Sequence, residues 1–357
     1  MTEEDLRQQR LYNLGLSGTP YATPAAVVAA LGAVQAQDYG GAAWALGLRL
    51  AGATAATIDA ALAEGSILRT HVLRPTWHFV TPADIRWMLA LTGPRVQAAM
   101  AYQARQLELD GATFAAAQTA IAAALQGGHC LTRADLSAVL ARAGIAATDP
   151  LRHGHLIMHA ELEGLICSGP RQGKQMTYAL LDERAPAAPS LTRDEALAEL
   201  TRRYFTSHGP ATIPDFVWWS GLTTADARAG LALAGGHLVQ QTVDGRTYWF
   251  APPAPPARAP APAAYLLPNY DEYIVGYTDR SAVFEPVAHG LDPRGNILFS
   301  HTIVVGGRVV GTWKRTLKKD AVVLETKLLA PLPPATTEAV ASAAARYGAF
   351  LELPVVV

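Results

Sequence analysis

The chain repeats a pattern in which alanine- and leucine-rich helical stretches precede two short strands joined by a polar turn. The clearest copy turns at Asp244-Gly245-Arg246, and another turns within residues 169–174. An Asp-Gly pair is a strong hairpin signal, because both central residues of such a turn adopt positive φ values. A less regular copy covers residues 20–110. Helices closed by a hairpin are typical of winged-helix modules, so three tandem copies predict a protein that contacts nucleic acid.

The spacing of these copies divides the chain into modules of an α+β fold. We expect winged helices at residues 1–112, where an N-terminal helix is included, at 113–184 and at 191–252. Stretches rich in proline and alanine follow the second and third modules, at 185–190 and 251–264. Such stretches favour an extended spacer over a helix.

The last part of the chain changes from helical to β-type patterning. Four runs with the character of strands, punctuated by glycines, lie at residues 264–275, 296–305, 308–313 and 321–329. A helical run follows them at 335–347. We therefore expect a small β-rich module at 263–357 with a closing helix.

Composition limits the surfaces that could bind DNA. The formal net charge of the 357 residues is −1, so contacts to phosphate must come from local basic patches and not from a general positive field. Arginines outnumber lysines by 24 to 5; arginine suits bidentate phosphate or base contacts, although a GC-rich genome also produces this bias. The densest basic run contains Arg308, Lys314, Arg315, Lys318 and Lys319.

Other features of the sequence indicate a reducing, cytoplasmic environment. The two cysteines, Cys130 and Cys167, lie in apolar surroundings and are too few for a disulfide framework. The N-terminus is acidic and lacks the apolar core of a signal peptide. No run reaches the roughly eighteen apolar residues of a membrane span. We expect a cytoplasmic protein with no membrane contact that acts as a monomer.

Gln35 and Gln37 are the first candidates for a site, and backbone geometry decides whether they can act together. A helix is expected through Val34, ending near the Gly40-Gly41 pair that follows the glutamines. Side chains two positions apart diverge on a helix but share a face on extended chain. The two amides therefore converge only if the helix ends there; otherwise they are solvated groups at a helix end.

A second candidate is the stretch from His71 to Val80, which has the alternation of a strand. One face would carry Leu73, Pro75, Trp77 and Phe79, and the other Arg74, Thr76 and His78. Pro75 cannot donate to a ladder, which confines the strand to an edge, as in a wing. The polar row fits a DNA-binding surface and fits an ordinary half-exposed edge strand equally well.

Two other groupings resemble sites but are assigned other roles. The histidine-rich group contains His153, His155, His159, Glu161 and Cys167. No partner for it recurs at a zinc spacing, so we expect no metal and interpret the histidines as part of a surface facing phosphate. Asp271 and Glu272 would face opposite ways on a strand, so one of them is expected to be structural. The sequence has no glycine-rich phosphate loop and no nucleophile elbow, and we expect no cofactor.

Five stretches in a fixed order resemble the winged-helix DNA glycosylases of the AlkZ and YcaQ type. They are Val34-Gln35-Ala36-Gln37-Asp38, RTHVLRPTWHFV at 69–80, WWSGL at 218–222, LLPNYDEYIVGY at 266–277 and VVGTWKR at 309–315. The likeness covers nearly the whole chain, and five ordered motifs are far more specific than one. It implies three tandem winged helices and a β-rich module that form a concave DNA-binding surface.

The resemblance also implies a catalytic pair. The family signature is Gln-x-Gln in one branch and Gln-x-Asp in the other. Gln35 and Gln37 match the AlkZ branch, whose members excise alkylated purines, including bulky adducts and crosslinks. Asp38 lies one place beyond the Gln-x-Asp position. The resemblance therefore implies a DNA glycosylase that acts on double-stranded DNA containing alkylated purines.

Two neutral amides suit this chemistry. Alkylation at N7 makes the purine a cationic leaving group, so the enzyme mainly has to hold water against a sugar that becomes cationic. No lysine lies near the motif, so we expect hydrolysis without a Schiff-base step.

We expect DNA contacts from the hairpin, the wings and the basic run, namely from Arg69, His71, Arg74, Thr76, His78, Arg171, Lys174, Arg246, Lys314 and Arg315. Two other functions are compatible with tandem winged helices. A non-enzymatic DNA-binding regulator would prefer one duplex sequence by several kcal/mol. A module that binds protein partners would have no salt-dependent affinity for DNA.

Overall fold

The computed structural model describes residues 1–185, 188, 190–252, 263–284 and 296–356. Positions 253–262 of the proline- and alanine-rich stretch expected at 251–264 lie outside the described residues, as do three positions of the stretch at 185–190. Among the helices that the structure describes, none is both long enough and apolar enough to span a bilayer. The mixture of helices and antiparallel hairpins confirms the expected α+β class.

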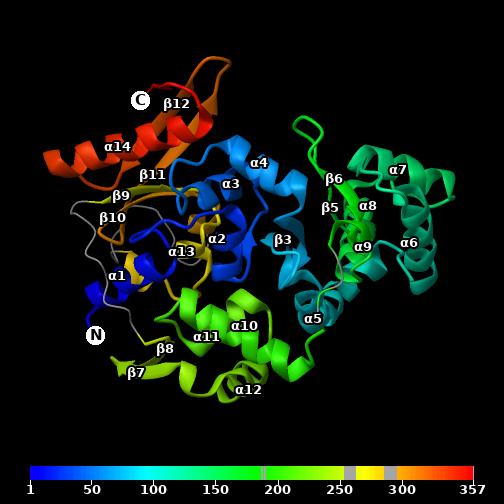
Figure 1. The fold of residues 1–357 in the computed structure, drawn as a ribbon, viewed down its shortest axis with the longest axis horizontal. Coiled ribbons are helices and arrows are strands. Elements are labelled where there is room, and N and C mark those ends of the chain that lie inside the picture. Colours follow the sequence, from blue (N-terminus) through cyan, green and yellow to red (C-terminus); the bar gives the residue numbers. More distant parts are fainter. Residues whose placement is uncertain (186–187, 189, 253–262, 285–295, 357) are drawn as a thin grey trace. The chain divides into compact units, whose positions relative to one another are not determined.

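The chain forms two compact units (Figure 1). The first combines Met1–Ile58, Ala198–Trp219 and Thr223–Val357, and the second combines Asp59–Leu197 with Ser220–Leu222. Helices α4 (Ala55–Glu64) and α10 (Arg193–Ser207) each begin in one unit and end in the other. This division reflects packing, and the winged-helix boundaries expected from the sequence stay a prediction.

The first unit contains most of the strands. Its other elements are α1 (Glu3–Asn13), α2 (Pro24–Leu31), β1 (Val34–Gln35), α3 (Tyr39–Gly47), α11 (Ile213–Ser220), α12 (Thr224–Ala234), η1 (Gly235–His237), β7 (Val239–Val243), β8 (Arg246–Phe250), β9 (Ala264–Leu267), α13 (Glu272–Val275), η2 (Ser281–Val283), η3 (Asn296–Phe299), β10 (His301–Val305), β11 (Arg308–Leu317), β12 (Val322–Leu328), α14 (Pro334–Leu351) and β13 (Val355–Val356).

Within the described residues, five strands of this unit form a sheet of order β13-β12-β11-β10-β9. Helix α14 packs against β9 and β13 (Figure 1). The ring of Tyr347 on α14 lies 5.0 Å from that of Trp44 and 5.1 Å from that of Trp313, centroid to centroid. The indoles of Trp44 and Trp313 donate to the carbonyls of Leu266 and Leu267 on β9. These contacts confirm a C-terminal sheet with a closing helix.

Two runs expected to be strands are helical in part. The run at 264–275 is strand only as β9, because Pro268 follows and the side chain of Asp271 accepts the backbone N–H of Tyr273 at 3.0 Å, which starts α13. The run at 296–305 begins with the short helix η3, and the strand β10 starts at His301.

The clearest turn of the sequence is confirmed. β7 pairs with β8 in antiparallel fashion, and Asp244 and Gly245 between them have φ values of 49° and 75°. Positive φ at both positions is what the Asp-Gly signal requires.

The second unit is mainly helical. Its elements are β2 (Leu68–Val72), β3 (Arg74–Val80), α5 (Ile85–Gln106), α6 (Gly111–Leu125), β4 (Leu131–Thr132), α7 (Arg133–Arg142), α8 (Pro150–Leu162), β5 (Ile166–Ser168), β6 (Thr177–Leu180) and α9 (Leu181–Arg184). Apolar side chains of α6, α7 and α8 form one core with Ile166 and Tyr178 of the β5–β6 hairpin. The expected hairpin after residue 163 is thereby confirmed.

The stretch from His71 to Val80 is not one strand. The chain reverses at Leu73, whose φ is 65°, so that β2 and β3 form a hairpin with Thr70 opposite His78. The backbone N–H of Leu73 donates to Thr92 Oγ1 at 3.1 Å. A Cβ added at Gly221, another residue with positive φ, would lie 2.3 Å from the Leu73 carbonyl oxygen. The turn therefore depends on neighbours distant in sequence, which explains why alternation alone predicted a continuous strand.

Candidate active site

The glutamine pair lies on non-helical chain. Helix α2 ends at Leu31, three residues earlier than expected, because Gly32 takes a φ of 83°. Extended residues follow as β1, and Asp38 then caps α3 by accepting the N–H of Gly41 at 3.2 Å. Gln35, at the end of β1, and Gln37, in the bend that follows, therefore stand on a non-helical connection between two helices.

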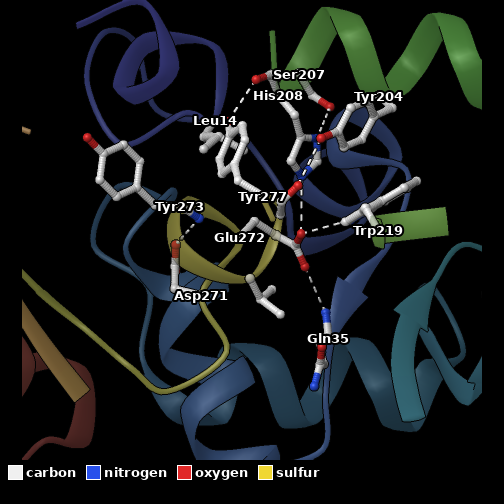
Figure 2. Close-up of polar contacts among 12 residues, drawn as sticks. Leu14, Gln35, Tyr204, Ser207, His208, Trp219, Asp271, Glu272, Tyr273 and Tyr277 are labelled. Carbon is white, nitrogen blue, oxygen red and sulfur yellow. Dashed lines mark hydrogen bonds and ion pairs between the residues drawn. The ribbon is translucent and has the colours of Figure 1, made fainter. Parts of the chain in front are cut away.

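The two glutamines differ in exposure. Gln35 is 6% exposed, whereas Gln37 is on the surface. The backbone N–H of Gln35 donates to Glu272 Oε1 at 3.0 Å (Figure 2). The pair thus runs from the interior of the first unit to solvent, with its inner end tied to a carboxylate.

Glu272 is the centre of a buried polar cluster (Figure 2). Its Oε2 accepts the indole N–H of Trp219 at 2.9 Å and lies 3.1 Å from Nε2 of His208. Nδ1 of His208 lies 2.8 Å from Ser207 Oγ, and the ring stacks on Tyr204 at a centroid distance of 4.7 Å.

Asp271, Tyr273 and Tyr277, which lie close to Glu272 in the sequence, are also buried. The carboxylate of Asp271 accepts hydrogen bonds from both terminal nitrogens of Arg49, at 2.9 and 3.0 Å, and both side chains are buried. Tyr273 donates its hydroxyl to the Gly307 carbonyl, and Tyr277 donates to the His208 carbonyl. The expectation that only one member of the Asp271-Glu272 pair is structural was wrong. It assumed a strand, whereas the two residues start α13 and both are fixed by buried partners.

Arg315 of the basic run lies beside the residue that follows the glutamine pair. Its Nη2 is 3.5 Å from Asp38 Oδ2, and its Nη1 donates to the hydroxyl of Tyr347 at 2.6 Å. Burial and the nearby Arg315 lower the pKa of His301 to about 4, and Nδ1 of that ring accepts the N–H of Asn269 at 2.9 Å. A Cβ at Gly41 would lie 2.7 Å from Asn269 Oδ1. The first unit therefore places a cationic side chain next to the Gln-x-Gln segment.

The hairpin of the second unit buries three of its expected DNA contacts. The guanidinium of Arg69 lies over the ring of Trp77 at 4.3 Å, His71 Nδ1 bonds to the carboxylate of Glu161, and His78 is fully buried. Burial, followed by the charge of Arg74, lowers the pKa of His78 well below its usual value. Arg69, His71 and His78 are therefore placed to support the hairpin rather than to touch DNA, and half-buried Arg74 and Thr76 are the more accessible members of the row.

The remaining basic candidates are distributed over both units. Arg171 makes a bidentate pair with Asp59 at 2.8 and 3.0 Å, and Arg246 pairs with Asp279. Lys174 is exposed on the β5–β6 turn, and Lys314 is exposed on β11. Both lysines are exposed, as is Arg246 despite its pairing with Asp279.

The histidine-rich group lies on and next to α8. His153 and His155 are buried, and burial together with Arg133 lowers the pKa of His153 to about 4. His159 stacks on Phe114 at a centroid distance of 3.9 Å. Burial raises the pKa of the Cys167 thiol to about 12. Packing explains these residues, so the expected phosphate-facing role of the histidines does not fit the two buried rings.

Sequence reasoning did not identify Glu272, His208 or Trp219 as neighbours of Gln35. Glu272 lies 237 positions along the chain from the amide that it holds. The signal that could have pointed to it is the adjacent Asp271-Glu272 pair inside an otherwise apolar and aromatic stretch, because buried carboxylates need partners.

Comparisons with known proteins give one consistent family. A sequence profile described as "DNA glycosylase AlkZ-like" matches residues 28–350. The chain is 27% identical to an "Interstrand DNA cross-link repair glycosylase" of Streptomyces sahachiroi in an alignment 349 positions long that covers 92% of each protein. Its fold is similar to the solved structure of the Streptomyces sahachiroi DNA glycosylase AlkZ, with a TM-score of 0.79, 23% identity, and coverage of 100% of this chain and 99% of that one.

Proposed function

Because the chain belongs to the AlkZ-like family of DNA glycosylases, we propose that it excises purines alkylated at N7, with Gln35 and Gln37 orienting the attacking water. Membership of this family gives the general activity: the protein is a monofunctional DNA glycosylase, a hydrolase of N-glycosyl bonds whose substrate is DNA. The proposal concerns the lesion and the residues that act on it.

The observation that carries the catalytic assignment is the extended backbone at Val34–Gln35 between two helices. We propose that the two side chains converge on one water from this connection, and the bond from Gln35 N–H to Glu272 fixes the inner end of the segment. Exposed Gln37 is the member that meets solvent and DNA first. Two amide oxygens on one edge can share a water molecule and offer it partial negative charge.

The charges around the pair support a cationic leaving group. Asp38, the nearest carboxylate in sequence, caps α3 and lies 3.5 Å from Arg315, so its charge is partly neutralised. A protein that had to protonate a neutral purine would need an acid at this place. A purine already cationic at N7 needs none, and neutral amides are enough to hold water at C1′ of the sugar.

The proposed architecture is three tandem winged helices followed by the β-rich module, at the boundaries given above. Lys174 on the β5–β6 turn and Lys314 on β11 are proposed to contact phosphates, together with Arg74, Thr76 and Arg315. We propose that the protein acts as a monomer on double-stranded DNA. The family favours this enzyme over the regulator and the protein-binding module that the sequence also allowed.

The range of lesions is proposed from the relative in Streptomyces sahachiroi. That protein is named for the repair of interstrand cross-links. We propose that the present chain also opens crosslinks formed through purine N7 atoms, because the cationic purine and the sugar bond to be cut are the same as in a single adduct.

The test is the release of 7-methylguanine from a duplex with one defined lesion, and the opening of an N7-crosslinked duplex. Replacing Gln35→Ala and Gln37→Ala together is expected to lower the single-turnover rate by about 10³-fold or more and to leave the Kd for DNA within about threefold. Gln126→Ala, at an exposed glutamine after α6, serves as the control with full activity. An undiminished rate in the double variant would remove the catalytic assignment, and release without crosslink opening would remove only the crosslink proposal.

A further inference from the structure

We infer that Glu272 is a positioning residue for the Gln-x-Gln segment, acting as an ionised carboxylate that holds the backbone N–H of Gln35 and is itself held by His208 and Trp219. This inference rests on the proposed catalytic role of Gln35 and Gln37. The carboxylate touches the backbone of the segment and not the reacting atoms, so it would set the place from which the Gln35 amide acts.

The contact with Ser207 fixes the orientation of the His208 ring. The hydroxyl of Ser207 donates to the carbonyl of Arg203 at 2.8 Å. Because that proton is committed, the oxygen of Ser207 must accept from Nδ1 of His208, 2.8 Å away. Nδ1 therefore carries a proton, and the face of the ring that meets Glu272 is Nε2.

The hydrogen-bond donors around Glu272 determine its charge. One proton lies between Nε2 of His208 and Oε2 of the glutamate, 3.1 Å apart. The carboxyl group also accepts N–H groups from Trp219 at 2.9 Å and from Gln35 at 3.0 Å. Two N–H donors aimed at one carboxyl group favour its ionised form. The proton therefore belongs to His208, and the pair is a buried imidazolium and carboxylate.

The charge of Glu272 strengthens its hydrogen bond to the Gln-x-Gln segment. β1 spans only two residues between Gly32 and the Asp38 cap. A hydrogen bond from an amide to a carboxylate is shorter and roughly twice as strong as one to a neutral acceptor. Glu272 itself is held on α13 beside Asp271, whose carboxylate is clamped by Arg49. Glu272 therefore holds the Gln35 N–H with a carboxylate that is itself fixed in place on α13.

The second unit offers a matched control. Glu161 is buried to the same extent as Glu272, and it too is bonded to a histidine, His71, and to an indole, that of Trp77. It holds no part of the Gln-x-Gln segment. The same substitution at the two glutamates therefore separates the loss of a buried carboxylate from the loss of the Gln35 anchor.

The experiment compares Glu272→Asp and Glu272→Gln with Glu161→Asp and Glu161→Gln in the full chain. Aspartate keeps the charge but withdraws the acceptor by one methylene, whereas glutamine keeps the length and an acceptor oxygen. We expect the rate at saturating DNA to fall about 30-fold in Glu272→Asp and about tenfold in Glu272→Gln, with the Kd for DNA unchanged; oriented groups are sensitive to displacements of about 1 Å. Both Glu161 variants are expected to keep the rate within about threefold.

A second measurement does not depend on activity. Hydrogen exchange of the Gln35 amide is expected to accelerate at least tenfold in Glu272→Gln and to stay unchanged in Glu161→Gln. Equal loss of rate in both pairs of variants, or unchanged exchange of the Gln35 amide, would overturn the inference. If the Gln35 and Gln37 double variant is fully active, the proposed function fails, and the exchange experiment still decides whether Glu272 holds the segment.

Discussion

Glu272 in the first unit and Glu161 in the second are both 1% exposed, and each is bonded to a histidine and to a tryptophan indole. The difference lies in the third group. Glu272 also accepts the backbone N–H of Gln35 in the two-residue strand β1, whereas Glu161 joins helix α8 to side chains of the β2–β3 hairpin. The same buried carboxylate therefore serves to position a backbone in one unit and to join two elements in the other.

This comparison teaches why burial alone is a poor guide to function. Desolvating a carboxylate costs several kcal/mol, and good partners offset that cost without exceeding it by much. Both glutamates meet this condition. What distinguishes them is the residue at the far end of the bond, and for Glu272 that residue belongs to the proposed catalytic pair.

The largest effect is expected where a buried glutamate is removed altogether. Glu161→Leu leaves His71 and Trp77 without their acceptor, and it should lower the free energy of unfolding by about 3–5 kcal/mol. The measurement is urea denaturation followed by tryptophan fluorescence. The rate of base release per folded molecule should stay within about threefold of the wild type. A loss below about 1 kcal/mol would break the comparison, because Glu161 would then not join the hairpin to α8.

A smaller effect is expected from histidines outside the two glutamate pairs. The pKa is lowered to about 4 for His153 in the second unit and for His301 in the first, by burial in both cases. Below pH 6.5 each of these histidines binds a proton in the unfolded chain, but in the folded chain it stays neutral down to about pH 4. Stability should therefore fall as the pH is lowered through this range. Allowing for solvent screening, each histidine should lower the free energy of unfolding by about 2 kcal/mol between pH 6.5 and pH 4.

The measurement is the midpoint of thermal unfolding between pH 7 and pH 4, for the wild type and for His153→Gln and His301→Gln. In each variant the midpoint of thermal unfolding should depend less steeply on pH than in the wild type. The unit that carries the substitution should be the one that gains resistance to acid. If the slope is unchanged in both variants, these rings are not the groups that make folding sensitive to acid.

The smallest effect is expected at the exposed lysines. Lys174→Ala in the second unit and Lys314→Ala in the first each remove one surface cation. Each should weaken DNA binding about equally for all sequences and reduce the slope of log K against log salt by about one. Lys327→Ala on β12, another exposed lysine of the same sheet that is outside the proposed contacts, is the control. Equal effects at Lys327 would indicate a general charge effect and not a defined DNA path.

Local signals predicted much of the fold. The Asp244-Gly245 turn, the closing helix and the hairpin after residue 163 follow from propensities that a few neighbouring residues express, and all three are present. The break before Gln35 was placed too late, because Gly32 ends α2 through its φ of 83° before the later glycines are reached. Family and enzyme class were correctly inferred from motifs in order. The α+β class was also correct, and the three tandem winged helices stay a prediction.

The site was less accessible to sequence reasoning. Leu73 adopts a φ of 65° because Thr92 and Gly221 surround the turn, and nothing in residues 71–80 expresses this. Glu272 could not be linked to Gln35, since the bond between them joins positions 237 apart. Contacts of such sequence separation are set by tertiary packing, and the roles of Gln35 and Gln37 stay a prediction.

The bond between Gln35 and Glu272 also has a consequence for synthesis on the ribosome. The motif near the N-terminus emerges early, but its acceptor is translated more than two hundred residues later. At roughly 5–20 residues per second this leaves an interval of tens of seconds at the slower rates. A nascent or truncated chain lacking α13 would carry both glutamines without the Glu272 carboxylate, so under the proposed role of Glu272 full base release would begin only after α13 has been made.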